Sequence, residues 1–215
     1  MDRRSFLASG AALAVVATAS RALAASGNPL LQKWVGAYEG LPPFDKVRLP
    51  DFEPAFRESM DMQRAEIAAI VANTSAPTFA NTIEALERSG EAFNNVSTLY
   101  YVHTSVLITP EMQAIEARMA PVLAAYADEL TQNGPLFARI QAVYAARERS
   151  GLTAEQQRLV WVYHNNFVQS GAALDAAGKS RLAAINLRLA DLYTTFGKNL
   201  LADEQKNYLV LDKDE

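Results

Sequence analysis

The sequence of 215 residues contains no cysteine. This absence excludes disulfide bonds, thiolate nucleophiles and cysteine-ligated zinc sites together. A chain without thiols also tolerates an oxidising compartment, because it cannot form mispaired disulfides. Half of the residues are hydrophobic and a fifth are charged, so the chain has enough apolar material to bury a sizeable core.

Positive charge is scarce as well. The 20 Lys and Arg residues are outnumbered by 24 Asp and Glu residues, which gives a formal net charge of −4. No cluster of Lys and Arg occurs after residue 24. A nucleic-acid-binding surface needs such a cluster to neutralise phosphates, so the composition argues against nucleic acid as a partner.

Long hydrophobic runs are missing too. The apolar and small residues 8–19 are too few to span a bilayer, which takes about 20 residues, so we expect no stable membrane anchor. Arg3 and Arg4 precede this run in a pattern, "RRSFL", that resembles the bacterial twin-arginine export signal. A small-x-small site ends at Ala24. We therefore expect residues 1–24 to be a twin-arginine-type signal peptide, cut after Ala24 during export to the periplasm.

Histidine is nearly absent, with only His103 and His164 in the chain. A zinc-peptidase helix needs His-Glu-x-x-His, which places two imidazoles one turn apart beside a carboxylate that activates water. Neither histidine starts that motif, because His103 precedes Thr-Ser-Val and His164 precedes Asn-Asn-Phe. We interpret both as ordinary helix histidines rather than metal ligands.

Other catalytic motifs are missing from the sequence. It contains neither the Gly-x-Ser-x-Gly of a serine nucleophile nor the Gly-x-x-x-x-Gly-Lys of a phosphate loop. A helical four-carboxylate metal site would need Glu-x-x-His pairs, and none occurs. The carboxylates at 203–204 and 212–215 are interpreted as solvated charge. The residues alone therefore assign no catalytic, metal-binding or substrate-binding side chain.

The chain does contain strong helical periodicity, which predicts an all-α fold. Residues 25–50 are rich in Pro and Gly and predict an extended lead-in. Residues 51–205 predict a helical domain, and residues 206–215, with the run "NYLVLD", predict the start of a strand region. We expect three aromatic residues to pin the lead-in to the domain: Trp34, Tyr38 and Phe44.

Several signals mark individual helices. Thr109 before Pro110 predicts a helix start, Gly134-Pro135 predicts its stop, and Thr153 with Gln156 forms a capping-box pattern for a later helix. Residues 99–108 are rich in β-branched and aromatic residues, but they continue a helical stripe, so we predict helix there. The last long helix carries one apolar stripe: Leu182, Ile185, Leu189, Leu192, Phe196 and Leu200.

The stretch "PTFANTIEALERSG" (77–90) predicts a short, well-defined helix. Asn81 is its expected N-cap, with Glu84 as the capping-box partner and Phe79 just ahead of the cap. Gly90 is the expected stop, and Arg88 places a positive charge near the negative end of the helix. Two classes of function are compatible with such a chain: a helical binding or adaptor domain, or a piece of a larger enzyme.

Six stretches, taken together and in order, resemble the N-terminal part of bacterial peptidyl-dipeptidases and oligopeptidase A, which are zinc metallopeptidases related to thimet oligopeptidase. The segment "NPLLQKWVGAYEGLPPFDKV" (28–47) favours the peptidyl-dipeptidase branch. The six stretches are spread in order along almost the whole mature chain: "PPFDKVRLPDFEPAF" (42–56), "AEIAAI" (65–70), "PTFANTIEALERSG" (77–90), "LFARIQAVY" (136–144), "EQQRLV" (155–160) and "RLAAINLRLADLYTTFGKNLLADE" (181–204).

The resemblance implies a multi-helix N-terminal lobe of a two-lobed helical metallopeptidase, forming a wall of a channel that admits short peptides. Members of the family bind zinc through His-Glu-x-x-His and a later glutamate, and peptidyl-dipeptidases release dipeptides from peptide C-termini. Because the metal motif is absent here, we expect a fragment that lacks the catalytic half, binds no zinc and is inactive alone. Its expected partners are an oligopeptide substrate and the missing half. The alternative is a free-standing helical module that binds peptides or proteins without catalysis.

Overall fold

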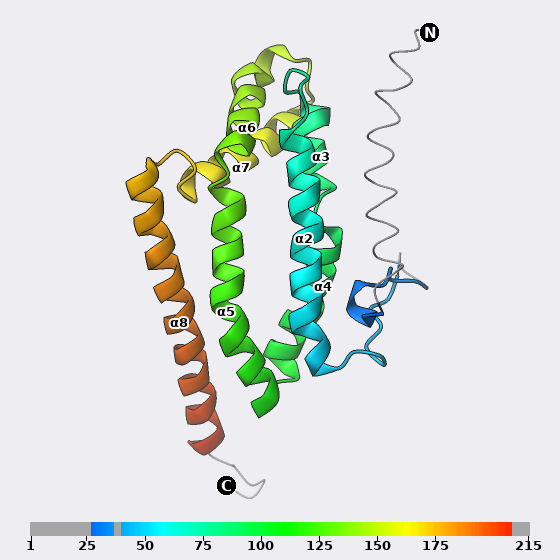
Figure 1. Cartoon of the computed structure of the whole chain (residues 1–215), viewed down its shortest axis with the longest axis vertical. Helices are drawn as coiled ribbons and strands as arrows, with labels where there is room; N and C mark the ends of the chain where they lie inside the picture. Colours follow the sequence, from blue (N-terminus) through cyan, green and yellow to red (C-terminus); the bar gives the residue numbers. More distant parts are fainter. Residues whose placement is uncertain (1–26, 37–39, 208–215) are drawn as a thin grey trace, which may run out of the picture.

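The computed structural model describes residues 27–36 and 40–207, and Figure 1 shows that they form a helical protein. The all-α prediction is confirmed, since the extended pairing within the described residues is limited to one isolated bridge between Val35 and Leu41. The elements are η1 (Pro29–Leu31), η2 (Leu49–Asp51), α2 (Phe52–Val71), the π-helical η3 (Phe79–Glu84), α3 (Ala85–Glu87), α4 (Glu91–Val106), α5 (Pro110–Thr131), α6 (Gly134–Ala146), η4 (Arg147–Arg149), α7 (Ala154–Gln169) and α8 (Ala176–Lys206).

Three long helices set the shape of the molecule. Helices α2, α5 and α8 lie along its long axis, with α8 at the edge beyond α5, while α6 and α7 close one end (Figure 1). Two cross-links join positions 65 residues apart, Arg64 with Glu129 and Arg118 with Glu53, so α2 and α5 run in the same direction. Helix α4 packs on α2, and α8 contacts α5.

Side chains from α2, α4 and α5, joined by the lead-in, form a first core. Phe56 of α2 contacts Tyr100 and Phe93 of α4, with its ring centroid 5.1 and 5.7 Å from theirs. Edge-to-face aromatic pairs of this kind add to the stabilisation from buried area. The main buried members are Leu30, Leu31, Phe52, Phe56, Met60, Val96, Leu99, Tyr100, Met112, Ile115, Met119 and Tyr126.

A second core lies between the end of α2 and the helices α6 and α7. Leu130 of α5 touches both cores, and α2 contributes to both along its length. Helix α8 contributes no buried residue to either core. The main buried members are Ile67, Ile70, Ile83, Leu86, Leu136, Phe137, Ile140, Val143, Val160 and Phe167.

The lead-in is held differently from the sequence prediction. Phe44 is wrong as an anchor, because half of its surface (51%) is exposed, whereas Trp34 does pack against the first core. Tyr38 lies outside the described residues. The actual anchors are Leu30 and Leu31, which are buried because the short helix η1 turns them onto α2 and α4.

The predicted helix starts at Thr109 and Thr153 are confirmed. The Thr109 hydroxyl accepts a hydrogen bond from the Met112 amide at 3.1 Å, and Thr153 forms a reciprocal capping box with Gln156. The stop assigned to 134–135 is wrong in detail. Helix α5 ends at Thr131, and residues 134–135 begin α6, because the Asn133 side chain caps the Leu136 amide at 2.9 Å.

The cap assigned within residues 77–90 is also wrong. Thr78 is the N-cap, and Asn81 is its reciprocal partner: the Asn81 amide donates to Thr78 Oγ1 at 3.2 Å, and the Thr78 amide donates to Asn81 Oδ1 at 2.8 Å. Phe79 is therefore the first residue of η3. Glu84 pairs with Arg88 instead of capping. The stop at Gly90 is confirmed, since it adopts a left-handed conformation (φ 77°) that favours glycine.

The helix predicted over 99–108 is confirmed up to Val106, the last residue of α4. Side-chain burial explains why helix wins over strand propensity: Val96, Leu99 and Tyr100 lie on one helical face against the first core. At the other end of the chain, α8 continues to Lys206, one residue into the segment assigned to a strand. Asn207 follows as an exposed bend, and residues 208–215 lie outside the described residues.

Candidate functional site

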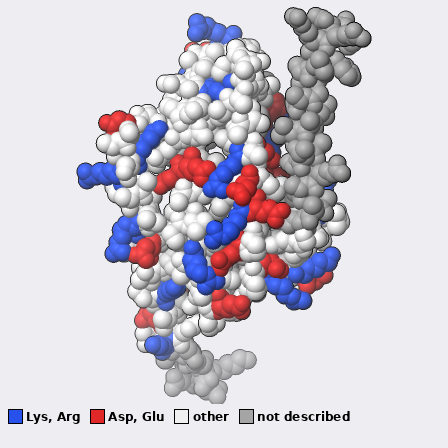
Figure 2. Space-filling view, viewed as in Figure 1, with Lys and Arg blue, Asp and Glu red and all other residues white. Residues whose placement is uncertain are grey.

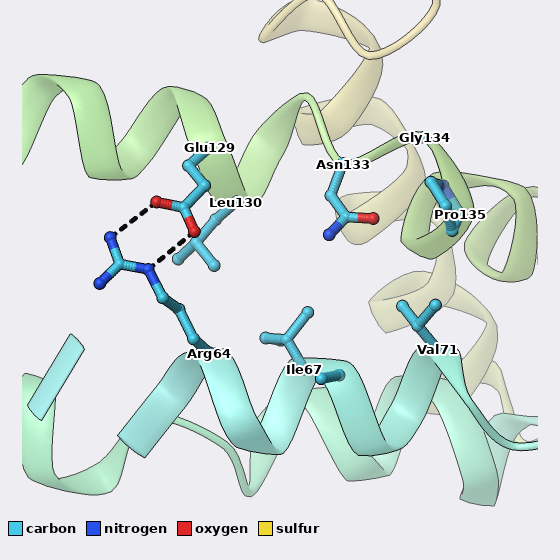
Figure 3. Close-up of a pocket in the computed structure, with 9 residues that line it drawn as sticks. Arg64, Ile67, Val71, Glu129, Leu130, Asn133, Gly134 and Pro135 are labelled. Atoms are coloured by element: carbon cyan, nitrogen blue, oxygen red, sulfur yellow. Dashed lines mark hydrogen bonds and ion pairs between the residues drawn. The ribbon is translucent and has the colours of Figure 1, made fainter. Parts of the chain in front are cut away.

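A groove runs between α2 and the junction of α5 and α6 (Figure 3). Its floor is apolar, and Figure 3 shows Arg64 of α2 reaching across one end toward Glu129 of α5. The cavity, about 400 Å³, lies toward the lower end of the range of small-molecule pockets. The lining residues are Arg64, Ile67, Ala68, Val71, Glu129, Leu130, Asn133, Gly134 and Pro135.

The charged end of the groove is an ion-pair network. Arg64 donates from Nε and Nη2 to the two carboxylate oxygens of Glu129 at 2.8 and 2.7 Å, and from Nη1 to Asp61 at 2.8 Å. The hydrogen bonds from Arg64 hold the pKa of the Glu129 carboxyl below its usual value. The side chains are 40 to 76% exposed, so solvent screening keeps the contribution to stability to about 1 kcal/mol or less. Because the guanidinium is committed to two carboxylates, the groove carries no free cation for an anionic ligand.

His103 lies on α4 beside the first core. Its ring meets Phe52 edge-to-face, with the centroids 5.2 Å apart, and its buried Nε2 has no hydrogen-bond partner. Burial lowers the pKa of His103, so the neutral imidazole is favoured.

His164 lies on α7 in an aromatic stack beside the second core. Its ring lies parallel to that of Tyr144, with centroids 3.9 Å apart, and it also stacks on Phe137 at 5.7 Å. Burial lowers the pKa of His164, and the nearby positive charge of Arg147 lowers it further. The structure thus places the two histidines against different cores, each in aromatic contacts.

The other residues singled out from the sequence do not form a site. Asp203 and Glu204 are exposed, as expected of solvated charge, and residues 212–215 lie outside the described residues. Arg3, Arg4 and Ala24 also lie outside them. Among residues 27–36 and 40–207, no three His, Asp or Glu side chains gather as metal ligands would. In the same part of the chain no helix has the length and apolarity needed to cross a membrane.

Two features were not found from the sequence. The pairing of Arg64 with Glu129 joins residues 65 positions apart and has no local signal. The second feature is that the apolar stripe of α8 is exposed. The sequence did not predict this, because it does not show which face of α8 packs on α5. Figure 2 shows Lys and Arg mixed with Asp and Glu over the face that carries α2, α5 and α8, with no single-sign patch that would attract nucleic acid.

Comparison with known proteins identifies relatives of this helical region. Over 185 residues the chain is 40% identical to the dipeptidyl carboxypeptidase of Escherichia coli strain K12, covering 86% of this chain and 27% of that protein. This chain is homologous to dipeptidyl carboxypeptidases. Identity to the dipeptidyl carboxypeptidase of Salmonella typhimurium strain LT2 is 37% over 187 residues, covering 87% of this chain and 27% of that protein. The resemblance to peptidyl-dipeptidases is therefore confirmed.

The chain spans about a quarter of the length of the dipeptidyl carboxypeptidases it matches. No family model matches the chain. The homology therefore covers a portion of those enzymes.

Proposed function

We propose that this chain is the N-terminal helical portion of an exported peptidyl-dipeptidase and forms part of the wall of its peptide channel. The hydrolytic residues are supplied by polypeptide that corresponds to the unmatched part of the relatives. The substrates are short peptides, from which dipeptides are released at the C-terminus. The observation that carries this proposal is the 40% identity to a dipeptidyl carboxypeptidase across 86% of the chain.

Zinc chemistry, which the family implies, has no fitting ligand set among the described residues. The His103 and His164 rings are in contact with separate cores, through Phe52 in one case and Tyr144 in the other. Neither lies in a group of metal-binding side chains within the described residues. We therefore assign no step of hydrolysis to this chain. Its role is to hold a helical surface against which a peptide and the catalytic part of the enzyme can lie.

The isolated mature chain, residues 25–215, is expected to release no dipeptide above background in the presence of zinc. The substrate is an oligopeptide with a blocked N-terminus and a free C-terminus. A chimera that carries these residues in place of the matched stretch of the Escherichia coli relative is expected to retain dipeptide release. The two polypeptides are compared by mass spectrometry of the products, with the unmodified relative as the positive control.

Two results would contradict the proposal. Turnover by the isolated chain would show that the active site lies within these residues after all. A folded chimera without activity, combined with saturable binding of peptides by the isolated chain, would instead favour the free-standing binding module.

We also propose that residues 1–24 direct export to the periplasm through the twin-arginine route. Replacing Arg3 and Arg4 together by lysine is expected to abolish export, because the pair is read by a receptor. Fractionation should then find the uncut precursor in the cytoplasm. Arg21→Lys, a change outside the pair, serves as the control and should leave cleavage after Ala24 intact. Equal export of both variants would exclude this route.

A further inference from the structure

Helix α8 presents two different faces along its length. The face toward α5 is mostly small and polar, with Ala183, Asn186 and Ala190 partly buried, although Leu187 also lines a pocket against α5. Asn186 Nδ2 donates to Asp128 Oδ1 at 2.6 Å, and Lys179 Nζ donates to the carbonyl of Gln132 at 3.1 Å. These contacts fix which side of α8 is turned to α5.

The apolar stripe of α8 lies on the other side. Successive residues of an α-helix are about 100° apart around its axis. The members of the stripe therefore lie within about 80° of one another around α8, and about 130° from the face that meets α5. Leu182, at the start of the predicted stripe, packs against the turn that holds Gly171 and Leu174. The remaining five are exposed: Ile185 (46%), Leu189 (40%), Leu192 (44%), Phe196 (65%) and Leu200 (47%).

A row of this kind is a candidate interaction surface. Scattered exposed apolar residues are normal on a protein surface, but an ordered stripe on one helix face marks an interaction site. Along the chain the stripe extends about 22 Å, from Ile185 to Leu200, at 1.5 Å per residue. It therefore offers four turns of helix to whatever covers it.

We propose that this α8 stripe is the seam on which the remaining polypeptide of the peptidyl-dipeptidase packs with an apolar face of its own. This inference rests on the proposed function. The relatives are about four times as long as the matched stretch, so the corresponding helix in them has further chain to pack against. An occupant in the same polypeptide packs without the loss of translational and rotational freedom that association of two molecules costs.

A second copy of the chain is a poorer occupant for this stripe. With about 200 Å² for a fully exposed residue of this size, the five side chains expose about 500 Å², less than the ~800 Å² per partner of a standard interface. Intramolecular packing has no such minimum area. The size of the stripe therefore favours a covalently continuous occupant.

The test uses the active chimera described above and paired double variants. Leu189→Glu with Phe196→Glu places two charges in the stripe. Val168→Glu with Val106→Glu is the matched control, because these apolar residues on α7 and α4 are also exposed, 40 and 72%. The stripe variant is expected to lower the melting temperature of the chimera by several degrees and its dipeptide release at least tenfold, whereas the control retains both. In the isolated chain both variants should have the same melting temperature as the unmodified chain, since the remaining polypeptide is not there to cover the stripe.

The outcomes separate this inference from the proposed function. If the stripe variant of the chimera has the same melting temperature and activity as the control, the proposal that the remaining polypeptide packs on the α8 stripe is wrong. A dimer of the isolated chain that the stripe variant abolishes, with the chimera unaffected, would assign the stripe to self-association and also overturn it. A folded but inactive parent chimera would contradict the proposed function alone, because the melting temperatures still report on packing at the stripe.

Discussion

Replacing Leu30 by alanine is expected to lower the free energy of unfolding by about 2–5 kcal/mol. Leu30 has no exposed surface and belongs to the first core, although it lies in a segment rich in Pro and Gly. The loss combines the smaller apolar area with a cavity that η1 cannot close, since Asn28 ties the segment down: its Nδ2 donates to the carbonyl of Asp51 at 2.9 Å. Urea unfolding followed by circular dichroism measures the change.

Phe44→Ala is the control for Leu30→Ala. It removes a larger side chain from the same segment, but Phe44 is half exposed and belongs to neither core, so we expect a clearly smaller change, about 1 kcal/mol or less. Equal losses for the two variants would mean that burial of Leu30 does not explain how the lead-in is anchored.

Replacing Arg139 by methionine is expected to lower the free energy of unfolding by about 2–4 kcal/mol. Arg139 is 8% exposed and holds the loop after α2. It donates from Nη1 to the carbonyl of Asn73 at 2.7 Å and from Nη2 to Asn81 Oδ1 at 3.0 Å. Methionine retains the apolar stem but leaves both acceptors without their charged donor. Thermal and urea unfolding both report the loss.

Two further variants isolate the contribution of the guanidinium group. Arg139→Lys retains the charge but not the planar fork, so it should recover only part of the stability. Arg149→Met removes an exposed arginine just beyond α6 and should have little effect. If Arg139→Lys is as stable as the parent, charge rather than the paired hydrogen bonds explains the role of Arg139.

Arg139 also shows why one cap was assigned wrongly. Thr78 and Asn81 are both good capping residues, three positions apart, and local rules do not choose between them. In the structure Asn81 Oδ1 accepts hydrogen bonds from the Thr78 amide and from Arg139, which is 58 residues away in sequence. By contrast, the caps at Thr109 and Thr153 involve only their own first turns, so the sequence predicted them correctly.

Side-chain direction was the other limit on sequence prediction. The period of three and four along α8 correctly predicted an apolar stripe, because periodicity depends only on helix geometry. It did not predict that the stripe faces away from α5, since that depends on contacts such as Asn186 with Asp128. The groove beside Arg64 was missed for the same reason: its two sides come from helices brought together only by the fold. Leu30 and Leu31 were overlooked because composition marked their segment as a surface linker.

Helix α2 has a consequence for how the molecule unfolds. Phe56 and Met60 belong to the first core, and Ile67 and Ile70, two to three turns further along the same continuous helix, belong to the second. Loss of either core removes the packing from half of this helix, and most helical stability in proteins comes from packing of the apolar face. We therefore expect the two ends of the molecule to unfold together through this shared helix, although their cores are separate.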